Sequence, residues 1–370
     1  MFEVFGGLKK HVSTKGSTGP QVTSFVLMSL RLSMLITLLA CVLVTAKTYI
    51  GDNIKCITGF EKQEHKAIET YCFIASTFTL VDLEGKTVPH PGVGPDAPRT
   101  NEDGTTEEAD RLRHAYYQWV PMVLVLQAVI YYFPSWLWDK IDKKFFSQAI
   151  CDLDSIHIGS IEDKLKTSAE YFSNSYTTHR SYAINFLLCE CLGFTIAVSN
   201  LFFTNAFLGG NFFEFGPGSI KYLSQHAADP DNPLNEIFPK VAKCTWYKYG
   251  ASGSIQKFDS MCVLPLNIVN EKTYIFLWMV YVLTASVCGV VLLFHLILFF
   301  VPNFRNTYLV FLARDQATKN HLLSVLHGAN YGDWFLVYHF QKNMAYFKQW
   351  VGKVHAHMEE TRRGAGSVAG

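Results

Sequence analysis

Long apolar blocks alternate with polar stretches along this chain of 370 residues. A helix that crosses a bilayer needs about 20 mostly apolar residues. Four blocks meet that length, over residues 25–46, 117–138, 182–204 and 274–301. Four such blocks spaced by polar segments are rare in soluble folds, which weighs against the alternative of four helices buried in a soluble core. The pattern therefore predicts an all-α membrane protein with four transmembrane helices.

The polar stretches divide the rest of the chain into loops and termini. They define an N-terminal segment at residues 1–24, a first loop at 47–116, a middle loop at 139–181, a second loop at 205–273 and a C-terminal region at 302–370. Apolar residues recur at helical spacing in the middle loop and over residues 308–326 and 333–351, which predicts further helices there. Asp333 is the expected N-cap of the last of them.

The cysteines indicate which side of the membrane each loop faces. Cys56 and Cys72 lie in the first loop, and Cys244 and Cys262 lie in the second. Disulfides persist in oxidising surroundings, so we expect both loops to be extracellular and both termini to be cytosolic. Most Lys and Arg residues close to the spans favour the same orientation. Four cysteines allow three disulfide connectivities, and their spacing does not choose among them. The same spacing differs from that of the compact cysteine pairs that bind zinc. No metal site is expected.

Charge and motifs narrow the class of protein. The 32 Lys and Arg residues nearly balance the 31 Asp and Glu residues, so a nucleic-acid partner is not expected. The 13 histidines are scattered, and the sequence has no HExxH motif, phosphate loop or nucleophile elbow. We therefore expect neither an enzyme nor a bound cofactor.

Several strings are similar to one family of membrane proteins. Residues 116–120 read YYQWV, and the second loop reads IFPKVAKC from residue 237 and CVLPLNIVNEK from residue 262. Shorter matches occur at residues 49–52 (YIGD, followed by Cys56), 207–210 (FLGG) and 332–335 (GDWF). On these motifs the chain resembles the innexins, the gap-junction proteins of invertebrates, from about residue 1 to residue 353.

The resemblance implies a fold and a function. Innexins have four membrane helices, a cytosolic helical cap and two extracellular loops joined by disulfides. These loops can carry short strands. By resemblance the pairs here are Cys56–Cys262 and Cys72–Cys244. The implied function is that of a gap-junction channel subunit at the plasma membrane. Copies form a ring, expected to be an octamer, around a wide, weakly selective pore for ions and small metabolites. The ring docks with a ring on the apposed cell, and other innexins and membrane lipids are further expected partners.

Two alternatives to a docked channel stay open. The chain would act as an undocked hemichannel that releases small metabolites, or as a junctional adhesion or scaffold protein whose pore stays shut. Residues 89–110 of the first loop, rich in Pro, Gly and acidic residues, read as a solvated, partly disordered arm. Partner selection or weak calcium binding is the alternative for that arm.

Three groups of residues are candidates for the pore wall. By resemblance, Phe2, Glu3 and Val4 belong to a pore-entering N-terminal segment, in which Glu3 would favour cations. Just outside the first span, Lys47, Asp52 and Asn53 are the next candidates. Within that span the small polar residues recur every four positions, at Ser29, Ser33 and Thr37 and on to Cys41 and Thr45. Packing between helices is the alternative for this stripe.

One pair of charges is predicted inside the membrane. Arg31 lies about 200° around the helix from the stripe, and a charged side chain within a span needs a partner or must reach the headgroups. Glu190 in the third span lies at a matching depth. We therefore predict an Arg31–Glu190 contact, with Arg31 extending to the cytosolic headgroups as the alternative.

Overall fold

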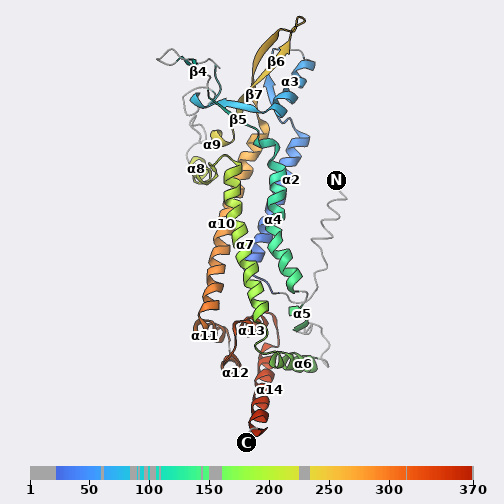
Figure 1. The fold of residues 1–370 in the computed structure, drawn as a ribbon, viewed down its shortest axis with the longest axis vertical. Helices are drawn as coiled ribbons and strands as arrows, with labels where there is room; N and C mark the ends of the chain where they lie inside the picture. Colours follow the sequence, from blue (N-terminus) through green and yellow to red (C-terminus); the bar gives the residue numbers. More distant parts are fainter. Residues whose placement is uncertain are drawn as a thin grey trace. The chain divides into compact units, whose positions relative to one another are not determined.

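The computed structural model describes residues 22–59, 62–83, 90, 92–95, 99–100, 106–107, 110–142, 145–149, 161–224, 234–313 and 315–368. The chain divides into two compact units, whose helices and strands are labelled in Figure 1. The sheet unit comprises Leu30–Tyr132 and Ile196–Ser286. The helical unit comprises Met1–Ser29, Phe133–Thr195 and Val287–Gly370. Each unit has its own cluster of buried apolar side chains.

Among the described residues, four helices are long and apolar enough to cross a membrane, and they correspond to the four predicted blocks. They are α2 (Phe25–Ile50), α4 (Val120–Asp142), α7 (Arg180–Phe207) and α10 (Pro265–Phe300). The predicted fold with four membrane helices is thus confirmed. The helix α10 begins at Pro265, well before the predicted span, and has 36 residues. At 1.5 Å per residue it is about 54 Å long, against about 30 Å of hydrocarbon, so part of it lies outside the bilayer core.

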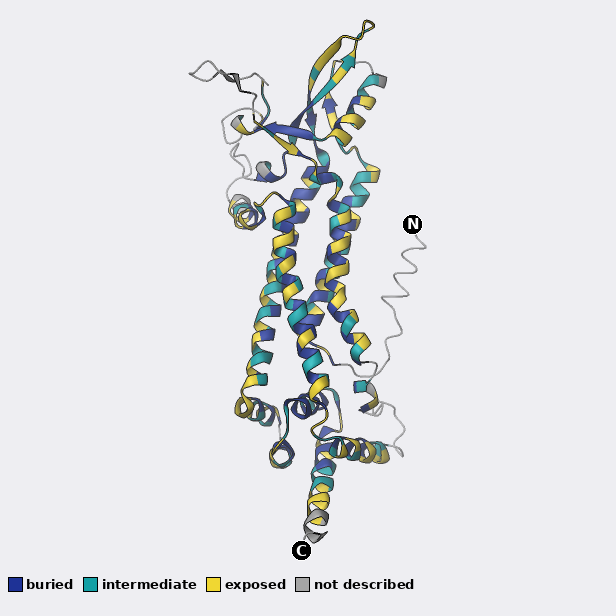
Figure 2. Cartoon of the chain, viewed as in Figure 1, coloured by how far each residue is buried: buried dark blue, intermediate teal, exposed yellow. Residues whose placement is uncertain are grey.

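The two loops of the sheet unit together build one antiparallel sheet. Its strand order is β1 (Lys55–Ile57), β7 (Ile255–Val263), β6 (Val241–Tyr249), β2 (Thr77–Leu80) and β5 (Arg111–His114). The strands β6 and β7 form a long hairpin, and the first loop supplies the strands on either side of it. The half of the hairpin near its turn is exposed, whereas the half near α10 is buried (Figure 2).

Short helices and turns complete the sheet unit. They are α3 (Lys62–Ala75), the 3₁₀ turns η1 (Val81–Leu83) and η2 (Tyr116–Gln118), α8 (Phe212–Ser224) and α9 (Leu234–Ile237). Within the predicted solvated arm, β3 (Arg99–Thr100) pairs with β4 (Thr106–Glu107) in a separate two-stranded sheet. The described part of that arm therefore contains regular structure.

The helical unit packs short helices around a buried one. The predicted middle-loop helices are α5 (Phe145–Ala149) and α6 (Ile161–Asn174). The two helices predicted after the fourth span are four in the structure: α11 (Pro302–Leu312), α12 (Gln316–Leu326), α13 (Tyr331–Asn343) and α14 (Phe347–Val368). Extended residues at Ala313 and Met344 separate them. Nearly every described side chain of α13 from residue 331 to residue 340 is buried, so α13 lies at the centre of this unit.

The prediction of Asp333 as an N-cap is wrong by three positions. Asn330 caps α13, and its side chain accepts a hydrogen bond from the Asp333 N–H at 3.0 Å. The Asp333 carboxylate in turn accepts from the Asn330 N–H and from the Thr177 N–H. It also lies 3.0 Å from His179 Nδ1. Asp333 therefore occupies the third position of a capping box and joins α13 to the turn before α7.

Candidate functional site

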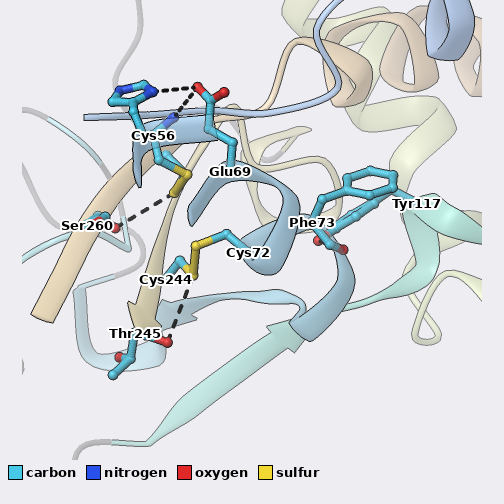
Figure 3. The surroundings of a disulfide bond; sticks show 10 residues. Cys56, Glu69, Cys72, Phe73, Tyr117, Cys244, Thr245 and Ser260 are labelled. Carbon is cyan, nitrogen blue, oxygen red and sulfur yellow. Dashed lines mark hydrogen bonds and ion pairs between the residues drawn. A yellow bond between two sulfur atoms is a disulfide. The ribbon is translucent and has the colours of Figure 1, made fainter. Parts of the chain in front are cut away.

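Two disulfides join the first loop to the second (Figure 3). Cys56 bonds with Cys262, and Cys72 bonds with Cys244; all four residues are buried. These are the pairs that the family resemblance implies. Cys56 lies directly opposite Cys262 in the pairing of β1 with β7, whereas Cys72 attaches α3 to β6. The sulfur atoms of these four cysteines lie close together, but they are bonded in pairs. They therefore offer no free thiolate to a metal ion.

Polar contacts attach the helix α3 to the strands that the disulfides join. The Glu69 carboxylate on α3 accepts from the Cys56 N–H at 3.4 Å and contacts His65 Nδ1 at 3.5 Å (Figure 3). Further along the hairpin, Lys248 on β6 forms an ion pair with Glu64 on α3 at 2.9 Å. The helix α3 is therefore attached to the sheet at several points along its length, with Cys72 as its covalent anchor.

The end of the β6–β7 hairpin is the most exposed described surface of the second loop. Tyr247, Tyr249 and Ile255 are 47%, 69% and 63% exposed. The turn closes with a hydrogen bond from the Gly250 N–H to the Ser254 carbonyl at 2.8 Å, and Gly253 has a φ of +79° that favours glycine. Large exposed apolar side chains at the end of a hairpin are typical of an interaction surface.

The YYQWV motif connects the loops to the second membrane helix. The Tyr116 hydroxyl donates to the Ile237 carbonyl at 2.7 Å, so the motif contacts the second loop. The Gln118 amide donates to the Phe73 carbonyl at the end of α3, and Tyr117 is buried with its ring centroid 5.4 Å from that of Phe73 (Figure 3). The motif therefore fixes the position of both loops at the start of α4.

Two residues of the small polar stripe on α2 pack against α10, which corrects part of the pore prediction. Ser33 and Thr37 are 1% and 0% exposed. The Ser33 hydroxyl bonds with that of Thr284 at 2.5 Å, and the Thr37 hydroxyl lies 3.3 Å from that of Tyr281. Ser33 and Thr37 therefore do not line a pore in this structure, and helix packing, the alternative for the stripe, accounts for them. Ser29 is half-buried, and its hydroxyl donates to the Val26 carbonyl in its own helix.

A buried polar network in the sheet unit was not expected from the sequence. The Gln127 amide on α4 donates to the Thr204 hydroxyl on α7 at 2.8 Å and accepts from the Tyr281 hydroxyl on α10 at 3.2 Å. Asn200 on α7 donates to the Tyr131 hydroxyl on α4 at 2.8 Å. Three membrane helices, α4, α7 and α10, therefore meet through hydrogen bonds between their side chains. Gln127 and Asn200 are polar amides within apolar blocks, and such residues are the sequence signal from which a buried network could have been predicted.

Glu190 is buried completely, and its partners lie in the helical unit. Its Oε1 accepts a hydrogen bond from the Ser24 hydroxyl, and its Oε2 lies 2.6 Å from His295 Nδ1. Ser24 also caps α2, because its oxygen accepts from the Val26 N–H at 3.1 Å. Arg31 belongs to the sheet unit, so the predicted Arg31–Glu190 pair stays a prediction.

Three other candidates for the pore wall lie at or just after the end of the first span. Lys47 is in the last turn of α2, and Asp52 and Asn53 follow it. Asp52 forms an exposed ion pair with Lys55 at 2.8 Å. The hydrogen bond from Lys55 and its charge lower the pKa of the Asp52 carboxyl. Phe2, Glu3 and Val4 lie outside the described residues.

Comparisons with known proteins agree with this arrangement. A sequence profile described as Innexin matches residues 24–358. The chain is 34% identical over 350 residues to "Innexin inx2" of Schistocerca americana, covering 93% of this chain and 94% of that protein. It is 34% identical over 355 residues to "Innexin inx2" of Drosophila melanogaster, with 93% and 92% covered. It is 33% identical over 358 residues to "Innexin shaking-B" of Drosophila melanogaster, with 93% and 91% covered.

Proposed function

Because the chain belongs to the innexin family, whose members are gap-junction channel subunits, we propose that its copies form a docked channel between adjacent cells. The pore is wide and weakly selective, and it passes ions and small metabolites. One observation supports the docking step above all: two disulfides unite both loops into a single sheet with an exposed hairpin. A surface that is rigid before contact loses less conformational entropy when it binds.

Eight copies form the ring in this proposal, as the family resemblance implies. Lys47, Asp52 and Asn53 remain candidates for the pore wall, since each keeps some exposure in the single chain. A pore-lining side chain must be accessible on the free subunit surface, which Ser33 and Thr37 are not. Phe2, Glu3 and Val4 complete the proposed wall at the other end of the first span.

The sheet unit faces the extracellular side in this proposal, and both termini are cytosolic. An even number of spans puts the termini on the same side, and disulfides are typical of an oxidising exterior. The sequence has no Asn-x-Ser/Thr acceptor for N-glycosylation. A single substitution can therefore introduce a glycan at one chosen place.

Two matched substitutions test this orientation. Ser252→Asn creates Asn-Gly-Ser at the exposed turn of the hairpin, and Glu359→Asn creates Asn-Glu-Thr on the exposed face of α14. We expect an endoglycosidase-sensitive shift in electrophoretic mobility for Ser252→Asn and no shift for Glu359→Asn. A shift for Glu359→Asn alone would reverse the orientation.

Electrical recording between paired cells tests the function itself. Both cells express only this chain, and junctional conductance and non-junctional membrane current are measured in parallel. We expect junctional conductance for the unmodified chain and for Glu359→Asn. A glycan at residue 252 should abolish it, because the bulky sugar separates the facing hairpins. Surface current without coupling would identify an undocked hemichannel. Cell adhesion without either current would identify an adhesion or scaffold protein.

A further inference from the structure

The helix α8 (Phe212–Ser224) follows α7 after a sharp turn. Gly209 and Gly210 have φ values of +77° and +98°, and the Gly210 N–H donates to the Asn205 carbonyl at 2.8 Å. Figure 1 shows α8 nearly end-on, whereas α7 and α10 lie along the page, so α8 runs across these membrane helices. The turn therefore leads the chain from a membrane helix into a helix that lies across it.

One face of α8 is packed firmly against its own unit. Phe212, Phe215 and Ser219 are buried. The Phe215 ring contacts that of Phe238 with centroids 5.4 Å apart. At Gly216 the helix approaches α10 so closely that a Cβ atom would overlap the Trp278 ring. These contacts fix the rotation of α8 about its axis, and so they determine which side chains point outward.

The outward side of α8 carries one apolar and one polar stripe. Phe213, Pro217 and Ile220 are exposed and follow the spacing of one helix face. Glu214 and Lys221 are also exposed, and each comes one residue later than a member of the apolar stripe. One residue corresponds to about 100° of rotation. The exposed surface therefore changes from apolar to charged around the helix, as in helices that lie in a membrane interface.

The apolar stripe of α8 continues the exposed apolar surface of a membrane helix. The Phe213 ring contacts Phe202 on α7, with centroids 5.4 Å apart. Phe202 is 61% exposed, and Phe203 beside it is 42% exposed. Phe202 lies five residues before the end of α7, about 7.5 Å from that end along the helix. Exposed apolar rings this close to the end of a membrane helix lie near the boundary between the acyl chains and the headgroups.

We propose that α8 lies flat in the headgroup region of the leaflet from which the disulfide-bonded loops emerge. Phe213, Pro217 and Ile220 enter the acyl chains, and Glu214 and Lys221 face the water. Pro217 fits this depth, because it has no N–H for the Phe213 carbonyl, which then needs water that the hydrocarbon core lacks. The occupant of the stripe is lipid, since the stripe is continuous with an exposed face of the spanning helix α7. The helix thus anchors the start of the second loop to the bilayer.

Spin labels on the full-length chain in phosphatidylcholine nanodiscs test the proposal. Ile220→Cys and Phe213→Cys carry nitroxides in the apolar stripe, and Lys221→Cys carries one in the polar stripe as a matched control. The unmodified chain is treated with the same label, and its signal measures the background from labels attached to the chain's own cysteines. Collision rates with oxygen, which concentrates in lipid, and with the water-soluble complex Ni-EDDA are then compared.

We expect oxygen to be the stronger relaxing agent at positions 213 and 220, and Ni-EDDA to be the stronger one at position 221. Greater access of Ni-EDDA at positions 213 and 220 would overturn the proposal, because α8 would then be a water-exposed loop helix. Protection of both positions from both reagents would also overturn it, because a second copy of the chain would then cover the stripe. Two labelled positions keep the test valid if one variant does not fold.

Discussion

Glu190 Oε2 and His295 Nδ1 lie 2.6 Å apart and join α7 to α10 within the helical unit. The other oxygen of Glu190 accepts from Ser24, the residue that caps the first membrane helix. A carboxylate near the start of a helix also interacts favourably with the helix dipole. Three membrane helices are therefore joined at one buried acid, at the point where the N-terminal segment leads into α2.

Removing the Ser24 hydroxyl is expected to destabilise the start of α2. Ser24→Ala loses the N-cap hydrogen bond and one partner of a buried carboxylate, and caps are worth about 1 kcal/mol. Ser29→Ala is the matched control, because that hydroxyl bonds only to its own helix and to a weak sulfur partner. The midpoint of thermal unfolding in nanodiscs should fall for Ser24→Ala and stay nearly constant for Ser29→Ala. Equal midpoints would show that the cap contributes nothing.

The buried network around Gln127 is expected to contribute modestly to stability. Gln127→Leu keeps the volume of the side chain but removes the bonds to Thr204 and Tyr281. Hydrogen bonds between membrane helices average about 0.6 kcal/mol, with a maximum of about 1.7 kcal/mol. Gln127→Leu combined with Tyr281→Phe should cost less than the two single changes added together, since both remove the same bond. Thermal midpoints of the four proteins measure this coupling, and strict additivity would contradict the shared bond.

Acid is expected to weaken the helical unit through His339 on α13. The ring is 4% exposed, and burial, with the nearby His295 and Lys342, lowers its pKa to about 3. Below pH 6.5 the unfolded chain binds a proton that the folded chain excludes, so stability falls as the pH falls toward 3. From pH 7 to pH 5 the loss is about 2 kcal/mol for this group.

His339→Phe should remove that pH dependence. The ring lies among Phe146, Phe186 and Phe335, so a phenyl group suits the site. Thermal midpoints at pH 7 and pH 5 should differ less in this variant than in the unmodified chain. His327→Gln, at an exposed position, is the control and should retain the full difference. An unchanged difference in His339→Phe would mean that other groups cause the acid sensitivity.

Much of the architecture follows from the sequence because it depends on length and polarity. Four long apolar blocks favour a bilayer, and in the described part of the chain a long apolar helix covers each of them. The stripe containing Ser33 was harder to assign, because small hydroxyl residues suit both a pore wall and a helix contact. Periodicity identifies a face of the helix but not the neighbour of that face. Only the position of Thr284 opposite Ser33 distinguishes the two.

Other features depend on partners that are distant in the sequence. Asp333 precedes an apolar run and reads as an N-cap, but Asn330 three residues earlier satisfies the same rule and is the cap in the structure. Gln127 and Tyr281 are 154 residues apart, and nothing local connects them. From the sequence, the helix α8 reads as part of a loop. Its packed, apolar and polar faces can be told apart only when the packed face is known from the structure. The Cys56–Cys262 pairing came from family resemblance, since four cysteines allow three connectivities.

The two disulfides are expected to differ in how much each contributes to holding its part of the first loop against the second loop. Cys56 and Cys262 lie opposite each other in paired strands, so the backbone ladder also holds β1 to β7. Cys72 is on α3, which has no such ladder to β6 and is otherwise attached by side chains such as the exposed Lys248–Glu64 pair. Exposed ion pairs contribute about 0–1 kcal/mol, too little to fix a helix.

Hydrogen–deuterium exchange would separate these two roles. Replacing Cys72 and Cys244 with Ser should raise exchange over residues 62–75 of α3 strongly, because the helix loses its covalent anchor. Replacing Cys56 and Cys262 with Ser should raise it less, since the β1–β7 ladder remains, and Glu64→Gln should have the smallest effect. Junctional conductance should follow the same order if docking needs α3 and the hairpin as one rigid surface. Equal exchange in the two double variants would show that the disulfides act as one unit.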